Sequence, residues 1–228
     1  MSATAKSATI GLTREVQIPI GRLSLSGDLI VPAGATGIAL FADGSGSSRY
    51  SPRNQIVARM LREAEVGALL FDLLTPHEEF IDARTAQLRF DIGLLAHRLI
   101  AATNWIRNES QTKGMALGYF GASTGGAAAL VAAAELGDHI QALVARGGRP
   151  DLAGSALPLV TAPTLLIVGA LDYPVLAMNR NALTQLRCER SLQIVPGATH
   201  LFEEPGTLEE VGRLAAEWFS KHFFKHGR

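Results

Sequence analysis

The most restrictive feature of the sequence is a five-residue turn, Gly-Ala-Ser-Thr-Gly, at positions 121–125. An apolar run at 115–120 precedes the turn, and an alanine-rich run at 127–134 follows it. This order predicts a buried strand, a sharp turn with Ser123 at its apex, and a helix. Side chains at the two glycine positions would collide with the neighbouring strand and helix, which explains why both are glycine. The turn therefore predicts an α/β structure that projects a serine hydroxyl above a sheet.

Such a turn is typical of a nucleophile elbow, in which the serine attacks a carbonyl carbon. The amide of Thr124 would then lie at a helix N-terminus, where it can donate to a developing oxyanion. The alternative is a small-residue turn that only lets a helix pack closely on its strand. Residues further along the chain distinguish the two interpretations.

A catalytic acid and a base are expected after the serine, in the order Ser, Asp or Glu, His. His200 follows a strand-like run at 191–195 and a short loop, which is the expected place for the base. The other histidines precede the serine, lie too near it or belong to the polar C-terminal tail; they are His77, His97, His139, His222 and His226.

Asp172 is the predicted acid, because it follows the uninterrupted apolar run at 164–168. Such a run is typical of a parallel strand that is buried on both faces. The strand that delivers His200 comes next, so the two loops should be neighbours. Asp151 is the rival acid, and the competing role of Asp172 is to cap the helix that begins near Pro174.

The bulk composition is that of one globular domain over residues 1–228, with residues 1–13 expected to form a flexible N-terminus. Hydrophobic residues make up 47% of the chain, enough for a sizeable core. Basic and acidic side chains number 21 each, and no apolar stretch reaches roughly 18 residues. We therefore expect neither nucleic acid nor a membrane as a partner. The N-terminal region has no apolar signal segment, so cytoplasmic residence is expected.

Strands and helices alternate from residue 37 onward, which predicts a mainly parallel eight-stranded sheet with helices on both faces. The expected strands are 16–20 and 23–31, forming an antiparallel pair, then 38–41, 66–70, 115–120, 141–145, 164–168 and 191–195. One expected helix begins at Ser51-Pro52. The other expected helices cover residues 85–109, 125–136, 174–187 and about 207–223. The connection between the strands at 141–145 and 164–168 is too short for a cap domain, which predicts an open, shallow site.

A second glycine-rich loop begins at Gly44, directly after a predicted strand, and allows two interpretations. Gly44 and Gly46, with Asp72 at the end of the next strand, form part of a dinucleotide-binding fingerprint. Arg49 stands where that fingerprint needs a third glycine. The other interpretation is an oxyanion hole, in which the amide of Ser45 donates alongside the amide that follows the nucleophile.

Four segments of the chain, 44–49, 51–54, 73–76 and 146–151, resemble those of small bacterial proteins in the dienelactone hydrolase-like branch of the α/β-hydrolase superfamily. The resemblance extends over nearly the whole chain and implies the α/β-hydrolase fold. Some similar proteins are linked to phosphoribosyltransferase domains, but this chain has no acidic diphosphate-sugar motif, so we do not infer that transferase activity.

Two residues depart from the pattern of this branch. Dienelactone hydrolases proper use a cysteine nucleophile where this chain has Ser123. Asp43 stands before the glycine-rich loop where similar proteins commonly have histidine. A carboxylate there would disfavour negative charge developing beside it, unless it is paired or turned away.

These features predict a serine hydrolase that cleaves small carboxylic esters or lactones through an acyl-enzyme intermediate. Ser123 is the expected nucleophile, His200 the base and Asp172 the residue that orients it, while the amides of Ser45 and Thr124 hold the oxyanion. No cofactor or metal is expected, since no His/Cys cluster has ligand spacing. The expected partner is a small-molecule ester or lactone, and an uncapped hydrolase of this size is a candidate homodimer.

Arg146 and Arg149 follow a predicted strand on the side where the site should open. The family resemblance suggests that they bind a substrate carboxylate in bidentate fashion. The alternative is a structural salt bridge with Asp151 or Glu78, and Glu78 itself is expected in a solvated loop with Glu79. Two other classes of protein remain as alternatives: a hydrolase-shaped binding protein with little catalysis, and a nucleotide-binding Rossmann-like protein.

Overall fold

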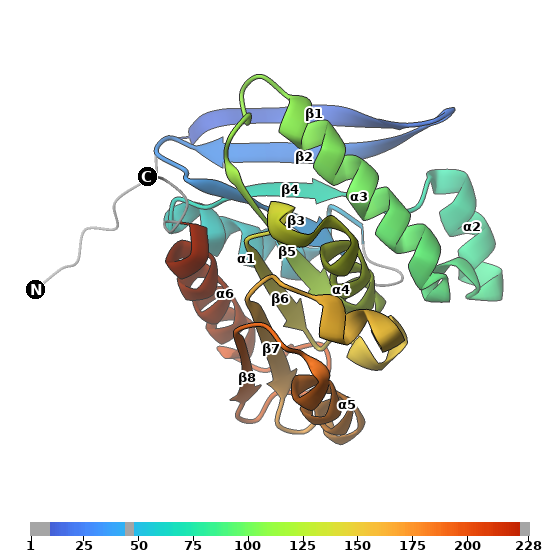
Figure 1. Ribbon diagram of the computed structural model, residues 1–228, viewed down its shortest axis with the longest axis vertical. Coiled ribbons are helices and arrows are strands. Elements are labelled where there is room, and N and C mark those ends of the chain that lie inside the picture. The colour runs from blue at the N-terminus through green and yellow to red at the C-terminus, as the bar shows by residue number, and fades with distance from the viewer. Residues whose placement is uncertain (1–9, 44–47, 224–228) are drawn as a thin grey trace, which may run out of the picture.

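The computed structural model describes residues 10–43 and 48–223, which form one eight-stranded sheet with helices on both faces (Figure 1). The strands lie in the order β1-β2-β4-β3-β5-β6-β7-β8. β1 pairs with β2, and β2 with β4, in antiparallel fashion, whereas all later neighbours are parallel. The predicted mainly parallel sheet and the antiparallel pair ahead of it are confirmed.

The strands are β1 Ile10–Ile20, β2 Leu23–Pro32, β3 Gly37–Ala42, β4 Gly67–Phe71, β5 Ala116–Ala122, β6 Ala142–Arg146, β7 Thr164–Gly169 and β8 Arg190–Val195. The α-helices are α1 Pro52–Glu63, α2 Pro76–Thr85, α3 Ile92–Asn108, α4 Thr124–Leu136, α5 Tyr173–Gln185 and α6 Thr207–Phe223. Three 3₁₀ segments complete the described structure, at η1 Leu88–Phe90, η2 Gly137–His139 and η3 Pro150–Leu159.

Two apolar layers enclose the sheet, and the central parallel strands are buried on both faces. α1 and α6 cover one face, where Val57 and Phe219 pack with the tilted ring pair of Phe41 and Phe120. α3, α4 and α5 cover the other face. Every residue of β3 and of β7 is buried, as the continuous apolar runs in the sequence predict. Because parallel strands end at the same edge, the loops after β5, β6, β7 and β8 meet there.

The expected flexible segment over residues 1–13 is wrong for residues 10–13, and residues 1–9 lie outside the described residues. β1 begins at Ile10, and Leu12 and Thr13 pair with Val31 and Ile30 of β2. Pairing with β2 satisfies backbone groups that an irregular segment would leave to water.

The predicted helix over 85–109 is also wrong at its start, since α2, η1 and α3 occupy this region. The side chain of Asp91 caps α3, and Ala86 ends α2 in a left-handed conformation with φ 53°. Glu78 and Glu79 lie in the first turn of α2 rather than in a loop, and Glu78 forms a capping box with Thr75.

The connection between β6 and β7 contains no cap domain. It consists mainly of η3, which packs against α4 and α5 on one face of the sheet. The described part of the chain, residues 10–43 and 48–223, also holds no helix that is long and apolar enough to cross a membrane.

Candidate active site

The turn between β5 and α4 holds Ser123 in a strained backbone conformation, with φ 51° and ψ −122°. L-residues rarely adopt this conformation, and such outliers cluster at functional sites. Three backbone hydrogen bonds hold the serine: its amide donates to the carbonyl of Arg146 at 3.3 Å, and its carbonyl accepts from Gly126 and Arg149 at 3.0 Å each. The neighbouring strand β6 and its following loop therefore support the strained turn.

The two glycines of the turn are required by close backbone approaches. A methyl carbon built at Gly121 would lie 2.6 Å from the Cα atom of Gly126. One built at Gly125 would lie 2.6 Å from the carbonyl carbon of Ala42 and 2.8 Å from that of Asp43. These distances are far shorter than ordinary carbon–carbon contacts. The steric reason for glycine that we inferred from the sequence is therefore confirmed.

Asp172 and His200 come together at the ends of β7 and β8. Nδ1 of His200 lies 2.6 Å from Oδ2 of Asp172, whose side chain is 10% exposed while that of His200 is 40% exposed. Backbone bonds from Ala170 to Val195 and from Leu171 to Ala198, at 2.9 and 3.0 Å, join the two loops. The side chain of Asp172 makes no capping bond to α5, so the imidazole contact is its main role.

The rival acid, Asp151, is occupied elsewhere. Its carboxylate binds Arg149 in bidentate fashion, with distances of 2.9 Å to Nε and 2.7 Å to Nη2. The structural salt bridge that the sequence suggested for Arg149 is present. Because Asp151 binds Arg149, it is not the carboxylate that pairs with His200; that carboxylate is Asp172.

Gly147 connects the histidine loop to the elbow. A methyl carbon built on Gly147 would lie 3.4 Å from Cε1 of the His200 ring. Gly147 directly follows Arg146, whose carbonyl accepts the amide of Ser123. Within residues 10–43 and 48–223, Ser123 and His200 share no hydrogen bond, so only the Asp–His half of a relay is formed. Catalytic hydrogen bonds in ligand-free sites are often long and tighten when substrate binds.

Only one of the two expected oxyanion donors lies within the described residues. Thr124 is the first residue of α4 and is buried, so its amide has no acceptor within the helix. Ser45, the other expected donor, lies outside the described residues.

Asp43 is buried and held by a side chain of α1. Its Oδ2 atom accepts a hydrogen bond from Nδ2 of Asn54, whereas Oδ1 is buried and has no hydrogen-bond partner among residues 10–43 and 48–223. Burial raises the pKa of Asp43 to about 7, against the opposing effects of Asn54 and Arg146. The carboxyl group is therefore protonated over part of the neutral range, which relieves the conflict with negative charge that the sequence raised.

Arg146 ends β6 beside the elbow and is buried with its guanidinium 5.8 Å from the ring of Phe202. Burial lowers the pKa of Arg146 to about 10, partly offset by Asp43. No side-chain hydrogen bond involves Arg146 among the described residues, and its Nε atom is buried without a partner. A buried guanidinium without acceptors is suited to an anionic ligand.

Asp72, the acid of the partial dinucleotide fingerprint, is bound to Arg49. Its Oδ1 atom accepts the amide of Arg49 at 2.8 Å, and its Oδ2 lies 4.0 Å from the Arg49 guanidinium. Arg49 is itself buried, and it also contacts Glu15 at 2.8 Å and Asp28 at 3.5 Å. The carboxylate that would bind a ribose is thus engaged inside the protein, which does not favour the nucleotide interpretation.

Sequence reasoning missed the contacts that surround the predicted residues. Asn54 and Phe202 carry no local signal for their roles beside Asp43 and Arg146, because the contacts join distant segments. No group of three or more His, Cys, Asp or Glu side chains in the described ranges is placed to hold a metal ion.

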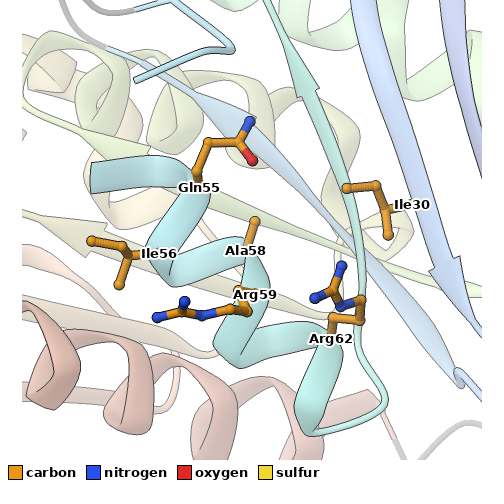
Figure 2. A pocket seen from close by; sticks show the side chains of 6 residues that line it. All are labelled: Ile30, Gln55, Ile56, Ala58, Arg59 and Arg62. Carbon is orange, nitrogen blue, oxygen red and sulfur yellow. The ribbon is translucent and has the colours of Figure 1, made fainter. Parts of the chain in front are cut away.

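A groove of about 270 Å³ lies on a different part of the surface, between β2 and α1 (Figure 2). Ile30 lines it from β2, and the remaining lining residues come from α1: Gln55, Ile56, Ala58, Arg59 and Arg62. None of the predicted site residues lines this groove.

Comparison with known proteins identifies the class to which this fold and site belong. A solved dienelactone hydrolase from Anabaena variabilis is 59% identical, with a TM-score of 0.90 over 92% of this chain and 98% of that chain. Est1E from Butyrivibrio proteoclasticus shares the fold at 16% identity, with a TM-score of 0.77 over 92% of this chain and 99% of that one. The protein thus has the α/β-hydrolase fold.

Residues 58–225 match the family model of the dienelactone hydrolase family, and the chain belongs to that family. Membership of this family, together with the hydrolases among its structural neighbours, supports the conclusion that the protein is a hydrolase. Two proteins from Mycobacterium tuberculosis strains, each named "Putative phosphoribosyl transferase", are 53% identical over 208 residues. The match covers 91% of this chain but only 46% of theirs, so the chain spans about half the length of these relatives.

Proposed function

We propose that the protein is a serine hydrolase that cleaves small carboxylic esters or lactones. The observation that carries this proposal is the strained backbone of Ser123 at the apex of a strand–turn–helix. The paired side chains of Asp172 and His200 at the same edge of the sheet support it. A turn that served packing alone would need neither a strained serine nor an oriented imidazole nearby.

The reaction follows from the chemistry of these groups. The Ser123 hydroxyl attacks the carbonyl carbon while Nε2 of His200 takes the hydroxyl proton. Asp172, bound to Nδ1, fixes the tautomer and stabilises the protonated ring. The proton then passes to the leaving alkoxide, which departs as an alcohol and leaves Ser123 acylated. Water, activated by the same imidazole, releases the carboxylic acid and restores the serine.

The amide of Thr124 is the proposed donor to the tetrahedral oxyanion, with Ser45 as its proposed second partner. The first peptide unit of α4 supports this role, because its N–H points out of the helix and the helix dipole favours negative charge there. Loss of one such donor typically lowers kcat by about 100-fold to 1,000-fold.

Substrates that carry a free carboxylate are the proposed preferred class, with Arg146 as the binding residue. Support comes from its buried guanidinium, which has no hydrogen-bond acceptor among the described side chains. Arg149 contributes less in this scheme, because Asp151 already occupies its guanidinium. The transferase name of the mycobacterial relatives is not extended to this chain, which lacks an acidic diphosphate-sugar motif.

The test is hydrolysis of short p-nitrophenyl esters by wild type, Ser123→Ala and His200→Gln. We expect turnover by the wild type and a loss of roughly 1,000-fold or more in either variant, since the two residues act together. A wild type that is inert towards these esters, or a Ser123→Ala variant that retains its activity, would overturn the proposal. An inert but folded protein would favour the binding-protein alternative.

Matched esters then test the substrate class. A p-nitrophenyl monoester of a dicarboxylic acid is compared with a neutral acyl ester of equal length. Arg146→Gln should raise KM for the acidic ester by about 10-fold and leave the neutral ester within two-fold, as expected for a lost charge-assisted bond. Arg149→Gln is the control and should change neither value. Equal effects of Arg146→Gln on both esters would contradict the assignment.

A further inference from the structure

The loop between β8 and α6 carries His200 and is closed by a neighbouring carboxylate. Oε2 of Glu204 accepts the backbone amide of Thr199 at 3.1 Å, and Oε1 accepts the Thr199 hydroxyl at 2.5 Å. Thr199 directly precedes His200. The Glu204 side chain therefore binds both the backbone and the side chain of Thr199, the residue that precedes His200.

The same loop contains a strained residue that needs such support. Phe202 is 1% exposed and has φ 56°, a left-handed conformation that bulky residues seldom adopt. Its amide donates to the Thr199 carbonyl at 3.4 Å, and its ring faces the guanidinium of Arg146. The turn from 199 to 204 thus folds back on itself, with the Glu204 carboxylate joining its two ends.

The side chain and the backbone of Glu204 have separate partners. The Glu204 carbonyl accepts two hydrogen bonds from Thr207 at the start of α6, one from the Thr207 amide at 3.1 Å and one from the Thr207 hydroxyl at 2.7 Å. The carboxylate takes no part in these bonds. Truncating the side chain therefore opens the histidine loop without removing the acceptor at the start of the helix.

We propose that Glu204 is a positioning residue for His200, which holds the imidazole against Asp172 and over Gly147 through its two hydrogen bonds to Thr199. This inference depends on the proposed function, because it concerns the residue assigned as general base. Glu204 does not touch the reacting atoms in this scheme. Its effect passes through Thr199 to the ring of His200.

The kinetic test compares Glu204→Ala with Glu209→Ala. Glu209 is an exposed residue in the first turn of α6 and makes no side-chain hydrogen bond or ion pair within the described ranges. Glu204→Ala should lower kcat by roughly 10-fold to 100-fold with KM within two-fold, because a displaced catalytic group loses rate more than binding. Glu209→Ala should leave both values within two-fold. In a Glu204→Ala, Thr199→Val double variant, kcat should fall no further than in Glu204→Ala.

A second readout does not depend on activity. In protein labelled with ¹⁵N-histidine, the proton between His200 and Asp172 gives a downfield resonance that His200→Gln removes. Glu204→Ala should shift or broaden this resonance, and Glu209→Ala should leave it unchanged. If wild-type protein proves inert towards esters, the proposed function fails while this resonance still tests the loop.

Two results would overturn the inference: an unchanged resonance in Glu204→Ala, or a kcat within two-fold of wild type, even where thermal stability is lost. Should Glu204→Ala fail to fold, Glu204→Gln and Thr199→Val each remove part of the contact. Both should then give a smaller loss of kcat in the same direction, and Thr199→Ser, which keeps the hydroxyl, should restore wild-type kcat.

Discussion

Replacing Gly125 with alanine should damage stability and activity together. The added methyl carbon would lie 2.6 Å from the carbonyl carbon of Ala42, still closer to its carbonyl oxygen, and 2.8 Å from the carbonyl carbon of Asp43. Carbon atoms normally meet at about 3.5 to 4.0 Å, so the helix start must move away from β3 by about 1 Å. All the obstructing atoms belong to the backbone and cannot rotate aside.

Overpacking of this kind costs about 3 kcal/mol of unfolding free energy. A displacement of about 1 Å at the nucleophile lowers the catalytic rate by roughly 100-fold. Urea unfolding followed by circular dichroism measures the first quantity, and the initial rate of p-nitrophenyl ester hydrolysis measures the second.

Gly93→Ala is the matched control for this substitution. Gly93 lies in the first turn of α3, where an added methyl carbon would meet only Oδ1 of Asp91, at an ordinary 3.5 Å. Alanine there should be neutral or stabilise the fold by about 0.5 kcal/mol. If Gly125→Ala unfolds within about 0.5 kcal/mol of wild type and keeps its rate within two-fold, the steric account of the elbow is wrong.

Three further predictions concern the charged groups. Asp172→Asn should lower kcat by roughly 1,000-fold or more and leave the unfolding curve nearly unchanged, since the carboxylate acts on the imidazole. Arg98→Met should lower the unfolding free energy by about 3 kcal/mol, because the buried guanidinium binds Glu78 at 2.5 and 2.7 Å and the carbonyl of Leu73 at 2.6 Å. Because the pKa of Asp43 is raised to about 7, the folded state binds one more proton than the unfolded state between about pH 4 and 7. The unfolding free energy of the wild type should therefore fall as pH rises through that window, by up to about 1.4 kcal/mol per pH unit. Asp43→Asn should remove this contribution to the slope. Parallel pH-dependent slopes in wild type and Asp43→Asn would contradict the last prediction.

Several groups surround Asp43 and set the size of that pH effect. Asn54 donates to the carboxyl group, and Arg146 and Arg53 favour its charged form, whereas Asp72 disfavours it. Glu78 has the opposite effect on the pH dependence of stability, at lower pH, because the hydrogen bond from Arg98 lowers its pKa to about 2. Its contribution to stability is present above about pH 4.5 and is lost as pH falls towards 2.

The local part of the site could be predicted from the sequence. Ser123 and Asp172 each follow a continuous apolar run, which identifies a buried parallel strand. His200 follows a strand-like run that also contains the polar residues Ser191 and Gln193, and the ends of all three strands share one edge. The glycine spacing around Ser123 reflects short-range sterics that are visible in five residues. The sequence therefore contained enough information for the sheet, the elbow and the Asp–His pair.

The rest depends on contacts between distant segments or on weak local patterns. Asp82 is the one buried residue of α2, so the apolar periodicity used to find helices is absent there. The capping box that begins at Thr75 was the signal that could have revealed this helix. The bond from Asn54 to Asp43 and the left-handed backbone of Phe202 arise only when the chain is folded. Residence in the cytoplasm and a homodimer stay predictions.

The central claim is that the strained serine at 123 is a reactive nucleophile. Treatment with a fluorophosphonate probe, followed by peptide mass mapping, tests it without knowledge of the natural substrate. We predict one covalent adduct per chain, on the peptide that contains Ser123, with no adduct in Ser123→Ala and strongly slowed labelling in His200→Gln. Folded wild-type protein that stays unlabelled, or an adduct on another residue, would contradict the account.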